Sequence, residues 1–372
     1  MRRAVTLLTF VLALSSAVAL SAAFTSHPAT KEQPVAAAVP SPSSSTVVSA
    51  ESESAITQPS AAPPDVGPPA RQSQDLPKTS SEDLLTAPLE ALSGAAIDIT
   101  TKATKEAVQE APSDAPVLYD NGCHLGWGDV TPKGCAFGDL SSQTTIVLTG
   151  DSHAAHWFGA LEVAALANHW RLVPVTKSGC PMADVRIYSS EPSKKGQHIE
   201  YEACNAWRKS AQEYIRSLNP TLVVFPMLSR RDLIGKSGQD SLDAWRDGIA
   251  ASIRATTVGS SKALVISDTP KTSGQNVPAC LAAHLVEQQL CGTPRTEAVL
   301  QERLDAERSG AALAGAYFSD ISNWLCSAAT CSAVVKGVVV YRDEHHLTDA
   351  FSRSKGPQMS QVIQTVLAPL PR

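Results

Sequence analysis

Two short polar segments, far apart along the 372-residue chain, carry residue types that could together activate a hydroxyl group. The first is Gly150–Ala154, which reads GDSHA, and the second is Asp343–Leu347, which reads DEHHL. A serine hydroxyl is a poor nucleophile at neutral pH until an imidazole takes its proton, and that imidazole needs a carboxylate to fix its tautomer and stabilise its charged form. We therefore predict Ser152 as the nucleophile, His346 as the general base and Asp343 as the residue that orients the base.

Each polar segment follows an apolar run, residues 144–149 in the first case and residues 338–341 in the second. Both runs have the length and composition of buried strands, and an α/β sheet places its chemistry where such strands end. Because Asp343 lies three positions before His346, its carboxylate can reach Nδ1 while Nε2 faces the serine. A helix is predicted over residues 153–168, so the serine's backbone N–H stands at a helix start and can donate to an oxyanion formed there.

Less specific interpretations of these residues stay open. Gly-Asp-Ser is also ordinary turn chemistry with a helix N-cap, and an Asp-x-x-His in a C-terminal loop is also compatible with solvated surface residues. His345 and Glu344 are alternatives as base and acid, although the spacing of Asp343 and His345 is the less favoured one. His156 and His169 are interpreted as surface or packing residues.

Strand and helix patterns alternate through the C-terminal part of the chain. The strand candidates are residues 144–149, 171–176, 221–225, 262–267 and 334–341. The helix candidates are residues 153–168, 204–218, 241–256, 296–312 and 348–367. This alternation predicts an α/β fold, a three-layer doubly wound parallel sheet with helices on both faces and catalytic loops at the carboxyl ends of its strands. Ser152 and His346 converge in such a fold despite their separation.

The N-terminal part divides into two segments of different composition. Residues 1–24 begin with Met-Arg-Arg and continue as an uncharged apolar stretch, which resembles a secretory signal. At about 20 residues the stretch is also long enough to span a bilayer uncut, so a signal peptide and a signal anchor both stay open, with export common to both. Residues 25–116 are rich in Pro, Ala and Ser and lack aromatic residues and cysteine, which predicts a disordered linker. Residues 117–372 suffice for one domain with a full core.

All eight cysteines lie in the predicted domain, and an even number in an exported chain favours disulfides. Sequence neighbours form four compact loops, so we expect the following bridges: Cys123–Cys135, Cys180–Cys204, Cys280–Cys291 and Cys326–Cys331. A zinc site is the alternative, but no Cys-x-x-Cys occurs and an oxidising compartment disfavours free thiolates, so no metal and no cofactor is expected. The net charge of −5, without a basic tract, argues against nucleic acid as a partner.

In combination, the motifs resemble those of a known family. GDSHA with DEHHL, together with Ser178–Pro181 (SGCP), Val277–Cys280 (VPAC) and the close pair Cys326 and Cys331, is similar to the SGNH hydrolase superfamily. The closest resemblance is to the periplasmic SGNH domain fused to type 3 membrane acyltransferases, which O-acetylate cell-envelope sugars. It covers about residues 119–370. It implies a flavodoxin-like fold and an exported serine-dependent O-acyltransferase that acts on cell-envelope carbohydrate through an acyl-serine.

Two alternatives to that function stay open, a carbohydrate O-acetyl esterase and a non-catalytic carbohydrate-binding module. The type 3 acyltransferase half is missing from the sequence, so the resemblance implies a separate membrane acyltransferase partner that supplies the acyl group. In the family pattern a Gly after the second strand and an Asn after the third complete the oxyanion hole. Gly179 fits the first role, but no Gly-x-Asn follows residues 221–225. Ser229, Arg230 or a backbone amide substitutes for the Asn, or fewer donors hold the oxyanion.

Overall fold

The computed structural model describes residues 99–194 and 196–369. By contacts between residues the chain divides into two units, Met1–Gln72 and Ser73–Arg372, and all of the described residues belong to the second. The predicted signal segment and the predicted linker up to residue 98 lie outside the described residues. In the part that is described, no helix has both the length and the hydropathy needed to cross a membrane.

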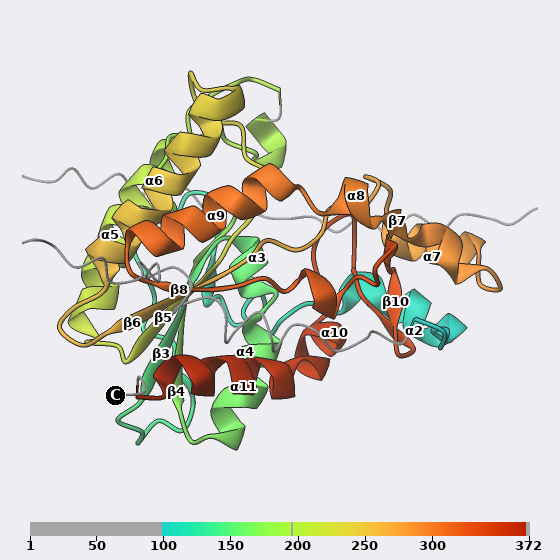
Figure 1. Cartoon of the computed structure of the whole chain (residues 1–372), viewed down its shortest axis with the longest axis horizontal. Coiled ribbons are helices and arrows are strands. Elements are labelled where there is room, and N and C mark those ends of the chain that lie inside the picture. The colour runs from blue at the N-terminus through green and yellow to red at the C-terminus, as the bar shows by residue number, and fades with distance from the viewer. Residues whose placement is uncertain (1–98, 195, 370–372) are drawn as a thin grey trace, which may run out of the picture. The chain divides into compact units, whose positions relative to one another are not determined.

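A mostly parallel sheet forms the centre of the described region (Figure 1). Its seven strands are β1 (His124–Leu125), β2 (Phe137–Gly138), β3 (Thr145–Gly150), β4 (Arg171–Lys177), β5 (Leu222–Pro226), β6 (Lys262–Ile266) and β8 (Tyr317–Ser319). The order is β1-β4-β3-β5-β6-β8, all parallel, while β2 pairs with β4 in the antiparallel sense. All residues of β3 and β5 are buried, and so are the last six residues of β4. They are buried because helices cover both faces of the sheet.

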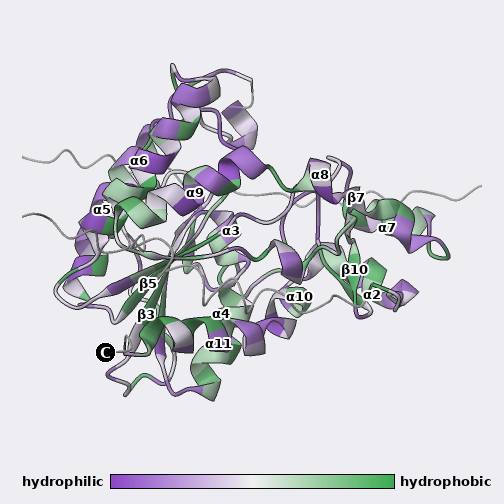
Figure 2. Cartoon of the chain, in the orientation of Figure 1, coloured by the Kyte–Doolittle hydropathy of each residue, from purple (hydrophilic) through white to green (hydrophobic). Residues whose placement is uncertain are grey.

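Two sets of helices cover the two faces of the sheet. On one face lie α4 (Phe158–Ala167), α10 (Asp349–Ser354) and α11 (Gly356–Leu367). On the other face lie α5 (Glu202–Ser217), α6 (Gly238–Thr256) and α9 (Gln301–Leu313). The alternation along β3 matches this division, since Ile146 and Leu148 pack in the first core and Val147 packs in the second. Figure 2 shows the largely hydrophobic strands β3 and β5 and the mixed hydrophobic and hydrophilic colouring of the helices around them. The predicted three-layer α/β fold is confirmed.

The remaining elements are short. The helices are α2 (Lys105–Glu110), α3 (Ser152–Ala155), α7 (Val277–Ala283) and α8 (Arg295–Ala298), with 3-10 turns at Ala111–Ser113, Pro192–Lys194, Gln288–Cys291 and Ser322–Trp324. Two small antiparallel ribbons join β7 (Thr293–Pro294) to β9 (Thr330–Cys331), and β10 (Val334–Val335) to β11 (Val338–Val339). Of the five predicted helices, the first, fourth and fifth are each divided in two, as α3 and α4, α8 and α9, and α10 and α11.

One predicted strand is wrong. The run 334–341 does not join the central sheet but folds back on itself as the β10–β11 hairpin. Lys336 and Gly337 make the turn with positive φ angles of 50° and 79°, a backbone conformation for which glycine carries no steric penalty. The last strand of the sheet is instead β8, a run of three residues that the hydrophobic pattern does not distinguish from its surroundings.

The packed region also begins earlier than the predicted boundary at residue 117. Val108 in α2 and Ala111 just after it are each only 2% exposed, and α2 lies against α7. Gln288 fixes the start of this segment, since its side chain accepts from the Ala103 N–H at 2.8 Å and donates to the Ala103 carbonyl at 2.7 Å. Residues 103–116, hereafter the strap, therefore belong to the folded unit. Their few apolar side chains pack against it.

Candidate active site

The structure brings the three predicted catalytic side chains together. The hydroxyl Oγ of Ser152 lies 2.8 Å from Nε2 of His346, and Nδ1 of His346 lies 2.7 Å from Oδ2 of Asp343. The other carboxylate oxygen of Asp343 accepts the backbone N–H groups of His345 and His346 at 2.8 and 2.7 Å. One carboxylate thus holds both the imidazole and the loop that carries it. Serine, histidine and aspartate form a continuous hydrogen-bonded chain of the kind that activates a hydroxyl.

Ser152 is placed by the turn between β3 and α3. Gly150 has φ +147° there, and a Cβ atom at this position would lie 2.4 Å from the Pro226 carbonyl oxygen, so only glycine fits. Asp151 is fully buried and caps the helix, since its carboxylate accepts the His153 N–H at 2.8 Å. The same carboxylate accepts the Leu228 N–H at 3.0 Å, which ties the turn to the chain after β5. The Gly-Asp-Ser turn therefore has two roles: Asp151 caps the helix, and Gly150 and Asp151 together hold Ser152 in position.

The base comes from outside the central sheet. His346 lies in the loop between β11 and α10, and that loop is closed by a bridge between Tyr341 and Leu347. Thr348, the N-cap of α10, donates its hydroxyl to the Val339 carbonyl at 2.6 Å. The expectation that a second sheet strand delivers the base is thus wrong, and a hairpin bound to a helix N-terminus takes that role.

The electrostatics favour a neutral base and an ionised acid at neutral pH. Burial lowers the pKa of His346 below its ordinary value, and the hydrogen bond and charge of Asp343 only partly oppose this. Burial would raise the pKa of Asp343, but its hydrogen bonds from the His346 side chain and from the loop backbone outweigh burial and hold the pKa well below the ordinary value. His346 is thus ready to accept the proton of Ser152.

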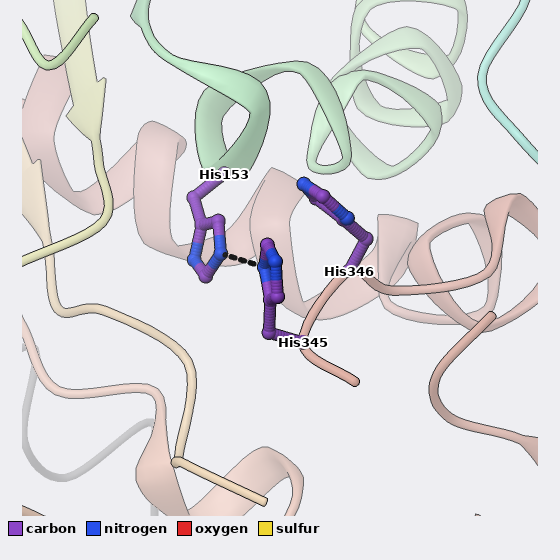
Figure 3. Close-up of side chains that lie close together, drawn as sticks. All are labelled: His153, His345 and His346. Carbon is purple, nitrogen blue, oxygen red and sulfur yellow. Dashed lines mark hydrogen bonds between the residues drawn. The ribbon is translucent and has the colours of Figure 1, made fainter. Parts of the chain in front are cut away.

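A second carboxylate–imidazole chain, which was not predicted from the sequence, lies beside the first. Figure 3 shows its two histidines, His153 and His345, next to His346. Asp268, in the loop directly after β6, has Oδ1 2.7 Å from Nδ1 of His153, and Nε2 of His153 lies 2.9 Å from Nδ1 of His345. His153 is 1% exposed. The only sequence signal for Asp268 is its position at the carboxyl end of a predicted buried strand, the position that also marks Asp151. His345, an alternative base at the sequence level, is the outer member of this chain.

Ser229 and Arg230 already have partners in this second chain. Ser229 donates both its N–H and its hydroxyl to Oδ2 of Asp268, at 2.9 and 3.1 Å. Arg230 donates to the Thr269 carbonyl at 3.0 Å, and its guanidinium lies 3.7 Å from the same Asp268 oxygen. Burial would raise the pKa of Asp268, but the charge of Arg230 and the hydrogen bonds from His153 and Ser229 outweigh burial and hold the pKa below the ordinary value. Both residues therefore support the Asp268 carboxylate in this arrangement.

Gly179 lies next to the serine turn by topology. It follows β4 by two residues, and β4 pairs with β3 up to Gly150. Its φ of +60°, with a Trp127 ring carbon 2.5 Å from where a Cβ would stand, restricts the position to glycine. Neither the Gly179 N–H nor the Ser152 N–H has a hydrogen-bond partner among the described residues. Two backbone donors at the carboxyl ends of neighbouring strands are thus free for an oxyanion.

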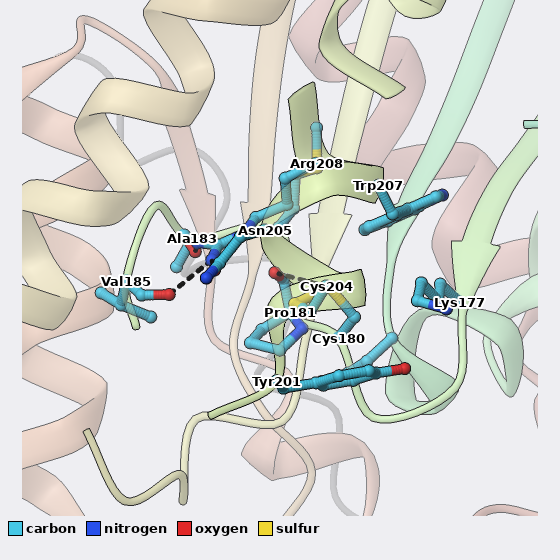
Figure 4. Close-up of a disulfide and its surroundings, with 12 residues drawn as sticks. Lys177, Cys180, Pro181, Ala183, Val185, Tyr201, Cys204, Asn205, Trp207 and Arg208 are labelled. Carbon is cyan, nitrogen blue, oxygen red and sulfur yellow. Dashed lines mark hydrogen bonds between the residues drawn. A yellow bond between two sulfur atoms is a disulfide. The ribbon is translucent and has the colours of Figure 1, made fainter. Parts of the chain in front are cut away.

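Several buried contacts fix the loop that carries Gly179 (Figure 4). The Cys180–Cys204 disulfide joins this loop to the first turn of α5, and the Tyr201 hydroxyl donates to the Ser178 carbonyl at 2.9 Å. The fully buried ammonium of Lys177 donates to the carbonyls of Gly126, Trp127 and Asp129, and burial lowers the pKa of Lys177 to about 8. The backbone around Gly179 is therefore held on both sides.

The four disulfides of the structure are those expected from the order of the cysteines: Cys123–Cys135, Cys180–Cys204, Cys280–Cys291 and Cys326–Cys331. Cys280–Cys291 links α7 to the 3-10 turn that carries Gln288, the partner of the strap. Since each cysteine is paired, no thiolate is left to bind a metal.

Among the described residues, one cluster of potential metal ligands is close enough to suggest a metal site, and it consists of three imidazoles. His153, His345 and His346 each offer a nitrogen within 4.8 Å of the others. In this arrangement, however, those nitrogens are engaged with one another, with Ser152 and with two carboxylates. A metal ion would have to displace the hydrogen bond between His346 and the serine, so the geometry fits the two hydrogen-bonded chains better than a coordination shell.

Comparison with known proteins gives a family for this site. No curated protein matches the sequence. The periplasmic domain of the lipopolysaccharide acetyltransferase from Salmonella ser. Paratyphi A is a structural neighbour with TM-score 0.47 and 16% identity, covering 70% of this chain and 94% of that one. Another is a carbohydrate esterase family 2 enzyme with its carbohydrate-binding domain from Corynascus thermopiles (Myceliophthora fergusii), with TM-score 0.37 and 14% identity over 61% of this chain and 67% of that one. Residues 122–361 match the family described as "SGNH domain (fused to AT3 domains)", and the chain belongs to this family.

Proposed function

We propose that the protein is an exported O-acyltransferase that moves an acyl group, in the first instance acetyl, onto a hydroxyl of a cell-envelope carbohydrate through an acyl-Ser152 intermediate. The observation that carries the proposal is the hydrogen-bonded chain from Ser152 through His346 to Asp343. A buried neutral imidazole with an ionised carboxylate behind it is the arrangement that makes a serine nucleophilic.

In the first half-reaction Ser152 Oγ attacks the acyl carbonyl carbon of the donor, and its proton passes to Nε2 of His346. The carbonyl oxygen becomes an oxyanion, for which the N–H groups of Ser152 and Gly179 are the proposed donors. When the tetrahedral intermediate collapses, the bond to the donor oxygen breaks and that oxygen takes the proton from His346. The products are acyl-Ser152 and the free donor alcohol, with His346 neutral again.

The second half-reaction reverses these steps with a new alcohol. The acceptor hydroxyl attacks the acyl carbon and gives its proton to His346 Nε2. Collapse breaks the bond to Ser152 Oγ, which takes that proton back. A carbohydrate hydroxyl as acceptor gives acyl transfer, whereas water gives the esterase reaction, which is the second candidate function because the same triad performs it.

Two observations support the setting of this reaction. The four disulfides fit an oxidising, extracytoplasmic compartment. The description of the family as fused to AT3 domains supports a membrane acyltransferase as the partner that supplies the acyl group. A non-catalytic carbohydrate-binding module is the less favoured alternative, since binding alone does not require the complete serine–histidine–aspartate chain.

The proposal is tested by incubating the protein with a chromogenic acetyl ester and envelope glycans, and by following both products by mass spectrometry. Acetylated glycan that forms with the wild type and not with Ser152→Ala supports the transferase. Free acetate without acetylated glycan, again dependent on Ser152, assigns the esterase instead. If neither product depends on Ser152, the enzyme proposal is wrong. A trapped peptide that carries an acetyl group on Ser152 identifies the intermediate.

A further inference from the structure

His345 lies between the two carboxylate–imidazole chains. Its Nδ1 is 2.9 Å from Nε2 of His153, and its ring lies against that of His346 with the centroids 3.9 Å apart. Nothing in the triad mechanism uses His345, although Asp268 and the buried His153 hold it in place. These contacts hold His345 beside the catalytic residues, so we looked for a function of its side chain in the reaction.

The hydrogen bonds link the proton positions of His153 and His345. Asp268 is ionised, so the contact at 2.7 Å requires a proton on Nδ1 of His153. In a neutral His153 this leaves a lone pair on Nε2, and the contact to His345 at 2.9 Å then requires a proton on Nδ1 of His345. In neutral His345, the form that burial favours, Nε2 is consequently a hydrogen-bond acceptor.

This acceptor is open to a ligand. Nε2 of His345 has no hydrogen-bond partner among the described residues, and it is not one of the buried polar atoms that lack a partner, so it reaches solvent. The neighbouring His346 also presents a lone pair on Nε2, toward the Ser152 hydroxyl during acylation and toward the acceptor hydroxyl once the serine is acylated. The rings of His345 and His346 therefore lie side by side next to Ser152, and in these tautomers each ring has an acceptor at Nε2.

We propose that His345 Nε2 accepts a hydrogen bond from a second hydroxyl of the carbohydrate, on the carbon next to the one whose oxygen reacts at His346, so that the pair of histidines selects a vicinal diol. The proposal rests on the proposed function and names its substrate class. Water and a simple alcohol make only the contact to His346. A phosphate or carboxylate group would bring oxygen lone pairs against the lone pair of His345, which disfavours it.

Two measurements test the proposal. The first is ¹⁵N NMR of the histidine rings in the full chain at neutral pH, which reports the tautomer directly. The proposal expects His345 with its proton on Nδ1. A proton on Nε2 would make His345 a donor and would overturn the proposal whether or not the protein is active.

The second measurement compares two ester substrates, a monoacetylated methyl pyranoside with a free hydroxyl on the neighbouring carbon and the same compound with that hydroxyl replaced by hydrogen. In the wild type we expect kcat/KM to be higher for the diol-type substrate by about three- to tenfold, the range of one hydrogen bond between neutral groups. His345→Ala removes this preference, and His345→Gln, whose Oε1 can stand near the position of Nε2, retains part of it.

The outcomes separate this proposal from the proposed function. If His345→Ala slows both substrates by the same factor, His345 is a structural support and the proposal is wrong. An unchanged preference in that variant also overturns it. If hydrolysis of both substrates is equal in the wild type and in Ser152→Ala, the proposed function has failed, and the NMR result still decides the orientation of His345.

Discussion

The carboxylate of Asp114 accepts a hydrogen bond from the backbone N–H of Ala350 at 3.0 Å, across 236 positions of sequence. Ala350 lies in the first turn of α10, three residues after the end of the loop segment that carries Asp343 and His346. The Asp114 carbonyl also accepts the Asp349 N–H at 3.1 Å. The strap therefore satisfies two N–H groups at the start of the helix that anchors the catalytic loop, groups which have no partner within the helix itself.

Asp114→Ala is expected to destabilise the protein by about 1 kcal/mol, the usual cost of losing a side chain that caps a helix. Urea unfolding of the full chain measures this. Asp114→Asn is the matched control, because its side-chain carbonyl can still accept the Ala350 N–H. If the two variants are equally stable, the hydrogen bond to α10 is not what Asp114 contributes.

Ser229→Ala separates support of Asp268 from oxyanion binding. Both donors of Ser229 are engaged with the Asp268 carboxylate, and the substitution removes only the hydroxyl contact. We expect kcat for an acetyl ester to fall by less than about tenfold, since loss of an oxyanion-hole donor costs about a hundredfold or more. A loss in that larger range, with KM unchanged, would instead assign the Ser229 hydroxyl to the oxyanion hole.

The pH profile of the reaction follows from His346. Its neutral form is the active one, and burial places its pKa below the ordinary value of 6.5. Activity should therefore rise with pH through a midpoint below 6.5 and stay level above it, as measured by kcat/KM for a neutral ester with the Ser152→Ala rate subtracted. The charge of Arg342 lowers the same pKa, while Asp343 raises it.

Asp343→Asn should move that midpoint to still lower pH, because it removes the negative charge that favours the imidazolium. The same variant should lose about 10⁴ in kcat, since the amide can hold the wrong tautomer of His346. If the midpoint shifts to higher pH in Asp343→Asn, the group whose titration controls the activity is not His346, the hydrogen-bond partner of Asp343.

The features that could be predicted from the sequence are those that depend on residues close together in the chain. The strands β3, β4, β5 and β6 are each built around a short apolar run, so their existence could be predicted. Asp343 and His346 belong to one loop, and their spacing of three decides that the carboxylate can reach the ring. Sequence neighbours among the cysteines also form the disulfides, because each pair closes a short loop.

What the sequence did not reveal depends on contacts between distant segments. The hairpin at 334–339 has the pattern of one strand, because valines stand on both sides of Lys336 and Gly337 and the pattern does not show the positive φ angles with which this pair turns the chain. The contact of Asp268 with His153 joins positions 115 apart, and no spacing rule links them. The strap looks like linker by composition, yet a few buried side chains and the hydrogen bonds of Ala103 and Asp114 suffice to dock it.

The most direct measurement of the central claim is the reactivity of Ser152 toward a fluorophosphonate probe, which labels only an activated serine. Mass spectrometry of the labelled wild type should place the probe on Ser152. Ser152→Ala should not be labelled, and His346→Ala should be labelled far more slowly because its serine has no base. A wild type that resists the probe, or one labelled no faster than His346→Ala, would contradict the assignment of Ser152, His346 and Asp343 as a working triad.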